Sequence, residues 1–341
     1  MRNFFNALRF IIGCRFPRHE KIDAFNIILP IGGDFLDAFV YQKTDGKSRG
    51  TILAIHGMSA RGNRDPRFVT VCKALAHCGY IIVSPLYPDI EGFLIKEETV
   101  DAIAKTIQSL AENPTLCPSG KISIFSASFS AGLSIIAASR TETRELVRAI
   151  CTIGTYSNVE TSVEFLLSEQ DNDEYARLII LRNFMHHSLG PSRDLSEALR
   201  VAILDNGNCQ ENPELPVLLR TLPRSVRRIF TRLQSEAAYR WYHWKRIYSP
   251  SKGVRGMLKR LSAVSTIDSL KAAVAIVHGV DDRVIPPSES VILHRRLREC
   301  NKLSRLSLTP AISHGDTTIT ASMIPALLDL TSTFAFFFKH V

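Results

Sequence analysis

Eight segments of the chain carry the apolar, β-branched pattern that is typical of strands. They begin near residue 26 and continue at residues 36–42, 51–57, 80–85, 121–127, 147–154, 272–279 and 303–308. The middle segments are continuous runs rich in Ile and Val, as expected for strands that are buried on both faces of a parallel sheet.

Helical patterns separate these strands. Two of the segments between strands carry apolar residues at helical spacing. The first has Phe68, Val71, Cys72 and Leu75, and the second has Val100, Ile103, Ile107 and Leu110. A third helix is predicted to begin near Leu133. Strands that alternate with helices through short loops predict a mostly parallel sheet flanked by helices, which is an α/β fold.

The alternation stops between residues 156 and 266, a stretch that is helical in character and contains no clear strand. We interpret it as an inserted helical cap. The predicted division is therefore an amphipathic segment at 1–24, a first core part at 25–155, the cap at 156–266 and a second core part at 267–341.

The N-terminal segment has an apolar helical face formed by Phe4, Leu8, Ile11 and Ile12. Such a helix either packs on its own domain or lies on a membrane surface, with Arg2 and Arg9 available to lipid phosphates. A processed lipoprotein leader that ends at Cys14 is a third interpretation. No segment offers 18 uncharged apolar residues, so no membrane-spanning helix is predicted.

The net charge of +9 is concentrated in one region. Residues 216–261 contain twelve Arg and Lys residues against the single acid Glu236, together with both tryptophans, Trp241 and Trp244. One interpretation is a solvated helical surface. The other is contact with an anionic partner, which would be a phospholipid surface or an acidic substrate rather than nucleic acid.

The seven cysteines form no C-x-x-C pair and have no metal-ligand spacing. An odd, scattered set predicts reduced and mostly buried thiols, and therefore a cytoplasmic protein that is soluble or peripheral to a membrane. The chain also contains no P-loop and no dinucleotide-binding fingerprint, so we expect neither a metal nor an organic cofactor.

The stretch KISIFSASFSAG at residues 121–132 places several serines directly after a predicted strand. A nucleophilic serine on a sharp strand-to-helix turn needs small residues two positions before and after it. Both Ser128 and Ser130 satisfy this rule. Because the apolar strand ends at Phe125, the apex of the turn is predicted at Ser128, with Ser130 as the alternative.

With these residues the chain resembles the α/β-hydrolase superfamily over about residues 25–155 and 270–341, although serine replaces both glycines of the G-x-S-x-G motif. The segment AIVHGVDDRVIPP is similar to the acid-bearing loop of that family, which implies Asp282 as the acid and a turn-capping role for Asp281. The loop after the last strand supplies His314 as the base, and Asp316 is an alternative acid.

The same resemblance extends to the oxyanion site. His56 and Gly57 resemble the H-G turn of the family, which implies backbone N–H donors at Met58 and Phe129. His56 itself is expected to be a structural residue of the turn. The segment GNRDPRF also resembles dienelactone-hydrolase-like members of the superfamily.

These features predict a serine hydrolase that cleaves a small or lipid-like carboxylic ester or thioester through an acyl-enzyme intermediate. An acyltransferase or peptidase with the same triad is the first alternative. A non-catalytic binding protein with this fold is the second.

Overall fold

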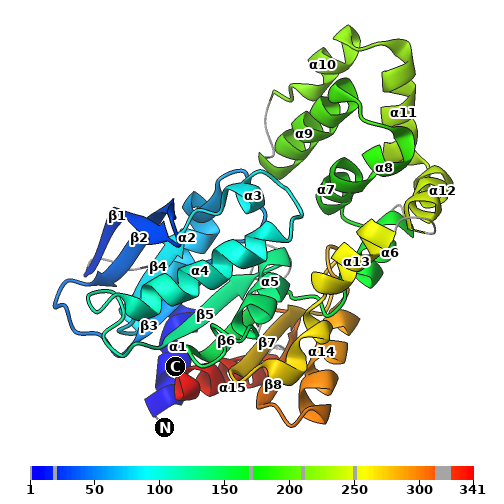
Figure 1. The fold of residues 1–341 in the computed structure, drawn as a ribbon. Coiled ribbons are helices and arrows are strands. Elements are labelled where there is room, and N and C mark those ends of the chain that lie inside the picture. The colour runs from blue at the N-terminus through cyan, green and yellow to red at the C-terminus, as the bar shows by residue number, and fades with distance from the viewer. Residues whose placement is uncertain (1, 18–20, 169–171, 209–211, 249–251, 312–323) are drawn as a thin grey trace.

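The computed structural model describes residues 2–17, 21–168, 172–208, 212–248, 252–311 and 324–341. Its centre is one eight-stranded sheet with the order β1-β2-β4-β3-β5-β6-β7-β8 (Figure 1). The six strands from β4 to β8 in this order are parallel, and β2 is antiparallel to both of its neighbours. The predicted fold class, a mostly parallel eight-stranded sheet flanked by helices, is therefore confirmed.

All eight predicted strands are present. Their bounds are β1 Ile22–Ile31, β2 Asp34–Lys43, β3 Thr51–Ile55, β4 Ile81–Pro85, β5 Ile122–Ala127, β6 Val147–Ile153, β7 Ala273–Gly279 and β8 Ser304–Thr309. The strands β3, β4 and β7 are buried along their whole length, which explains their unbroken apolar sequences.

Helices cover both faces of the sheet. One face carries α1 Arg2–Arg15, α2 Pro66–His77 and α15 Ile324–His340, whereas the other carries α4 Glu98–Glu112, α5 Phe129–Ala138 and α14 Pro287–Glu299. Alternate residues of β3 divide between the two resulting cores, Ile52 toward the first and Leu53 toward the second. Among the described residues, the loops between these strands and helices also contain four short helices. They are α3 Pro88–Glu91, η1 Gly62–Arg64, η2 Ala263–Ser265 and η3 Ile267–Ser269.

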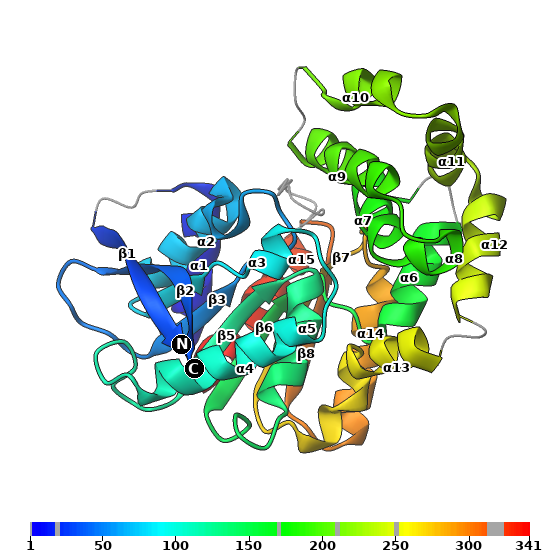
Figure 2. The same ribbon diagram turned by 45° about the horizontal axis from the view of Figure 1, so that its top comes forward.

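Between β6 and β7 the described residues form a run of helices, which we call the helical insertion. Its members are α6 Val159–Ser168, α7 Glu174–Phe184, α8 His186–Leu189, α9 Arg193–Asn208, α10 Leu215–Thr221, α11 Arg224–Ser235, α12 Ala237–Tyr248 and α13 Lys252–Arg260. Figure 2 shows these helices grouped to one side of the sheet.

A buried carboxylate fixes the start of the helical insertion. Glu289 of α14 accepts hydrogen bonds from the backbone N–H groups of Ser157 and Asn158, both at 2.9 Å, and from the hydroxyls of Ser157 and Thr161. A buried carboxylate is costly unless its oxygens are satisfied in this way. The chain therefore leaves the sheet for the insertion in one defined direction.

Helix α1 buries a face that differs from the predicted one. Its buried residues are Asn6, Ala7 and Phe10, and Phe10 contacts the aromatic rings of Phe334 and Phe338 in α15 edge-on. The predicted apolar face is instead largely exposed at Phe4, Leu8 and Ile12. Helical periodicity alone did not distinguish the two faces because both are apolar.

The described cysteines form no disulfide, and four of them, Cys72, Cys78, Cys117 and Cys151, are buried, as predicted for reduced thiols. Across the described ranges, no helix is both long and apolar enough to cross a bilayer.

Replacing Gly132 by Ala tests the packing of α5 on the segment after β6. A Cβ atom at Gly132 would lie 2.2 Å from Cζ of the buried Tyr156 ring. We expect Gly132→Ala to lower the free energy of unfolding by about 2 kcal/mol in urea denaturation. Gly256→Ala in α13 is the control, because its Cβ would meet only the flexible end of Arg260. Equal stability of the two variants would contradict the packing argument.

Candidate active site

Ser128 occupies a strained turn between β5 and α5. It has φ 58° and ψ −135° and is the N-cap residue of α5. A residue other than glycine at such angles costs on the order of 1–3 kcal/mol and persists only when its surroundings hold it. Here the Ser128 N–H donates to the Ile153 carbonyl at 2.7 Å, and the Ala131 N–H donates to the Ser128 carbonyl at 2.9 Å.

The loop after β3 packs beside the serine turn at Gly57. A Cβ atom at Gly57 would lie 3.4 Å from the Ser128 Cβ and 3.5 Å from the Ala127 carbonyl oxygen. A methyl group at position 57 would therefore make ordinary van der Waals contact with the serine turn, so the loop after β3 lies directly beside that turn.

The neighbouring serines have structural roles beyond their small size. Ser130 is fully buried, and its hydroxyl donates to the His56 carbonyl at 2.5 Å. The hydroxyls of Ser126 and Ser134 share a hydrogen bond of 2.7 Å beneath the turn. Of the two serines that fit the motif, Ser128 is at the apex and Ser130 lies within the first turn of α5.

His56 is a buried and neutral residue that ties the ends of two strands together. Its Nδ1 lies 2.9 Å from the Gly57 carbonyl, and its Nε2 accepts the Tyr87 N–H at 3.3 Å. Burial lowers the pKa of His56 to about 4, although the hydrogen bond to Gly57 and the charge of Asp65 partly oppose this. With both ring nitrogens engaged by the backbone, His56 is structural, as the sequence suggested.

Met58 and Phe129, the predicted oxyanion donors, lie on the two loops that meet here. Phe129 is the first residue of α5, and its ring stacks on Tyr156 with centroids 5.5 Å apart. Met58 follows Gly57, and its carbonyl accepts a hydrogen bond from the Tyr175 hydroxyl at 2.9 Å. Tyr175 belongs to α7, so the helical insertion reaches the loop of the predicted oxyanion site.

The sequence analysis did not predict Tyr175, because its partner is 117 residues away. The Tyr175 ring also makes a T-shaped contact with the Phe93 ring, with centroids 5.8 Å apart. A Cβ atom at Gly207 in α9 would lie 2.5 Å from the Tyr175 ring, so glycine at this position makes room for it.

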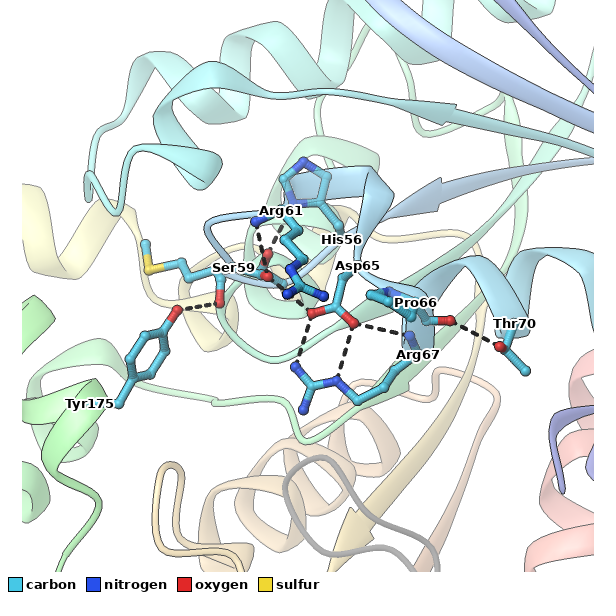
Figure 3. A network of polar contacts seen from close by, with 10 residues as sticks. His56, Ser59, Arg61, Asp65, Pro66, Arg67, Thr70 and Tyr175 are labelled. Carbon is cyan, nitrogen blue, oxygen red and sulfur yellow. Dashed lines mark hydrogen bonds and ion pairs between the residues drawn. The ribbon is translucent and has the colours of Figure 1, made fainter. Parts of the chain in front are cut away.

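A polar network holds the rest of the same loop (Figure 3). Asp65 caps α2 by accepting the Arg67 N–H, and its two oxygens receive the Arg67 guanidinium at 3.1 and 2.9 Å. The Ser59 hydroxyl also donates to Asp65 at 3.0 Å. Burial acts to raise the pKa of Asp65, but these bonds outweigh it and leave the pKa below its ordinary value.

Asp282 follows β7 and is almost fully buried. Its Oδ1 accepts the N–H groups of Val284 and Ile285 at 2.8 and 3.0 Å, and its Oδ2 lies 3.3 Å from Nε2 of His278. The turn-capping role that the sequence suggested for Asp281 therefore belongs to Asp282, whereas Asp281 is exposed. His314 and Asp316 lie outside the described residues.

The first turn of α7 contacts both loops of the candidate site. The Asp173 N–H, at the N-cap of α7, donates to the Arg283 carbonyl at 3.1 Å, next to Asp282. Two residues later Tyr175 binds the Met58 carbonyl. This one helical turn of the insertion therefore joins the loop of the predicted acid to the loop of the predicted oxyanion donor.

No protein-family model matches the chain, and no curated protein matches its sequence. Solved structures do match. An acylaminoacyl peptidase in complex with Z-Gly-Gly-Phe-chloromethyl ketone superimposes with a TM-score of 0.56 at 14% identity, covering 96% of this chain and 43% of that chain. Dipeptidyl peptidase 4 of Porphyromonas gingivalis gives a TM-score of 0.55 at 10% identity, covering 94% and 36%.

A hyperthermophilic esterase from Pyrobaculum calidifontis gives a TM-score of 0.51 at 15% identity, covering 98% of this chain and 90% of that one. The chain thus spans less than half the length of the two peptidases and most of the esterase. At these identities the likeness establishes the fold, which is that of the α/β-hydrolases. The narrower resemblance to dienelactone hydrolases stays a prediction.

His56 gives the protein an expected sensitivity to acid. In the unfolded chain it takes up a proton below about pH 6.5, whereas in the folded protein it does so only near pH 4. Acid therefore favours the unfolded state. As the pH falls through that window, protonation of His56 lowers the free energy of unfolding by about 3 kcal/mol. Urea unfolding at a series of pH values should show a shallower acid dependence for His56→Gln than for the wild type. Identical slopes would contradict a neutral, buried His56.

Proposed function

We propose that this chain, which has the α/β-hydrolase fold, is a serine hydrolase that cleaves a carboxylic ester or thioester through an acyl-enzyme intermediate. The observation that carries the proposal is the strained turn at Ser128, which projects a serine between the end of a central strand and the N-terminus of α5. Strain of this kind is retained where a side chain must be presented in one orientation.

In the proposed reaction Ser128 Oγ attacks the carbonyl carbon of the substrate. His314 accepts the serine proton and then delivers it to the leaving alcohol or thiol. Asp282 holds the histidine tautomer and stabilises its cation. Water then attacks the acyl-enzyme with His314 as the base, which releases the acid and restores Ser128.

Each tetrahedral intermediate carries a negatively charged oxygen, which must be stabilised by hydrogen-bond donors. We assign this role to the N–H groups of Met58 and Phe129, because the loop of Met58 lies beside the turn that leads into α5. The N-terminus of α5 adds its favourable dipole, since Phe129 is the first helical residue. Loss of one such donor typically raises the barrier by about 3 kcal/mol.

The Asp282 environment supports the role of an acid. Two backbone N–H groups, those of Val284 and Ile285, bind Oδ1. The second oxygen lies beside the ring of His278, whose Nδ1 is in turn 2.6 Å from the Ser290 hydroxyl. The carboxylate is thus fixed in orientation by the acid loop on one side and by His278 of β7 on the other.

Labelling with a fluorophosphonate tests the nucleophile. We expect wild-type protein to form an adduct on Ser128, and Ser128→Ala to lose at least about 10⁴-fold in turnover of an activated ester while unfolding at the wild-type temperature. Ser130→Ala is the matched control and should keep its label on Ser128. An adduct on Ser130, or full activity of Ser128→Ala, would contradict the assignment.

Tyr175 provides a second test through the oxyanion loop. The variant Tyr175→Phe lacks the hydroxyl that binds the Met58 carbonyl. If the transition state loses about 1 kcal/mol of stabilisation with this hydrogen bond, kcat falls about fivefold. Because the phenyl ring and its packing remain, KM for a small ester should change little. Tyr242→Phe, at an exposed position of α12, is the control and should leave both constants unchanged. A change confined to KM would contradict a positioning role.

A further inference from the structure

Helix α1 presents a second apolar face to solvent, opposite the one that packs on the protein. The buried face consists of Ala7 and Phe10 with Asn6. The outward face carries Phe5, Leu8, Ile12 and Phe16, which are exposed at 65%, 40%, 50% and 64%. Their spacing of three or four residues aligns them as one stripe along the helix. The helical turn continues through Phe16, whose N–H donates to the Ile12 carbonyl.

Basic side chains flank this stripe. Arg2, Arg9 and Arg15 lie on α1, the helix contains no acid, and none of the three forms an ion pair with another described residue. At 100° per residue, Arg9 falls on one side of the stripe and Arg15 on the other. The guanidinium of Arg15 also lies over the Phe16 ring, 5.5 Å from its centroid.

A surface hollow of about 580 Å³ lies at the end of the stripe. Its polar lining is Arg9, Arg15 and His77, and its apolar lining includes Ile12 and Phe16. Burial lowers the pKa of His77, and the charges of Arg9, Lys43 and Lys21 lower it further. His77 is therefore uncharged at neutral pH, and Arg9 and Arg15 give the hollow its positive charge beside an apolar rim.

We propose that α1 is an interfacial helix that binds the protein to an anionic lipid surface. The stripe of Phe5, Leu8, Ile12 and Phe16 enters the region between headgroups and acyl chains, and Arg9 and Arg15 contact lipid phosphates. Apolar burial combined with electrostatic attraction is the usual basis for such binding. The hollow beside Arg9 and His77 takes a headgroup phosphate.

Charge favours a lipid surface over a second copy of the chain as the occupant. A two-fold symmetric contact through α1 would bring the arginines of one copy next to those of the other, and such like-charge contacts are unfavourable. An anionic membrane neutralises the same arginines. The position of α1 is also compatible with docking, because Figures 1 and 2 both place it apart from the helical insertion.

In the basic region of the insertion, the surface that composition suggested for membrane contact, Tyr242 is exposed at 55%, but the other aromatic side chains are buried or partly buried. Trp244 is only 1% exposed. Arg232 lies over the Tyr239 ring at 3.8 Å, and Arg255 lies over the Tyr248 ring at 4.8 Å. In α1, by contrast, the aromatic rings of Phe5 and Phe16 are exposed and available for insertion.

Flotation of the intact protein with vesicles tests the proposal. Wild-type protein should float with vesicles of phosphatidylcholine mixed with phosphatidylglycerol, remain unbound with phosphatidylcholine alone, and lose binding in high salt. The double variant Arg9→Gln with Arg15→Gln should bind about 25-fold more weakly, on the basis of about 1 kcal/mol per basic residue near an anionic surface. Phe5→Ser with Phe16→Ser should also abolish flotation.

Three controls keep the test specific. Val217→Ser in α10 removes an equally exposed apolar side chain elsewhere and should bind like the wild type. Arg224→Gln with Arg228→Gln removes two exposed charges of α11 and should also bind normally. Thermal unfolding should show all variants folded, since every altered side chain is exposed.

The proposal is overturned if wild-type protein does not float with anionic vesicles, or if the α1 variants float as well as the wild type. It is equally overturned if the α11 variant alone loses binding, which would place the membrane contact on the insertion. A lipid-free dimer in light scattering that Phe5→Ser with Phe16→Ser makes monomeric would identify a second copy of the chain as the occupant instead.

Discussion

The backbone turn at Ser128 is the constraint on which the surrounding structure depends. Its positive φ is unfavourable for a residue with a side chain, so neighbouring groups must hold it in place. The Ile153 carbonyl at the end of β6 fixes its N–H, and Gly57 brings the loop after β3 against it. Close packing explains a small residue after β5, because a Cβ atom at Gly132 would overlap the Tyr156 ring.

His56 extends this constraint to the neighbouring strands. Its carbonyl accepts the Ser130 hydroxyl, and its ring accepts the Tyr87 N–H at the end of β4. A charged imidazole in this buried position would be costly, and the lowered pKa keeps it neutral. The strands β3 and β4 and the helix α5 are thus linked around the serine turn by uncharged hydrogen bonds, while the ion pair of Asp65 and Arg67 lies at the more exposed end of the loop.

The helical insertion is connected to the core through backbone groups of the same loops. Tyr175 and the Asp173 N–H bind the carbonyls of Met58 and Arg283, and Asn183 of α7 binds the backbone of Phe93 and Ile95. A shift of α7 would therefore disturb the loops of the predicted oxyanion donor and acid together. Contacts to backbone atoms leave no trace in the residue types of the core loops, which is why the sequence did not reveal this coupling.

Patterns that depend on neighbours in the chain were predictable from the sequence. The eight strands follow from runs of β-branched residues, and the apex of the turn at Ser128 follows from the point where the apolar strand ends. Contacts between distant residues were not. The sequence offered small size as the reason for Ser126 and Ser130, whereas both also form buried hydrogen bonds with partners that only the fold brings near.

The basic region of the insertion shows why a count of charges does not describe a surface. Arg240 contributes to the excess at 216–261, yet it is fully buried, and its guanidinium donates to the carbonyls of Leu167, Leu233 and Gln234. Burial lowers the pKa of Arg240 to about 10, so it stays charged at neutral pH without facing solvent. Arg260 is paired with Glu97 of the core.

Helix α1 has fewer charges but a different geometry. Its arginines flank an apolar stripe that the packed face leaves exposed, and this order of charged and apolar groups matches the order of layers at a membrane surface. The location of each charge relative to exposed apolar groups, rather than the number of charges, therefore decides which surface suits an anionic bilayer. By that criterion α1 suits it better than the more basic helices of the insertion.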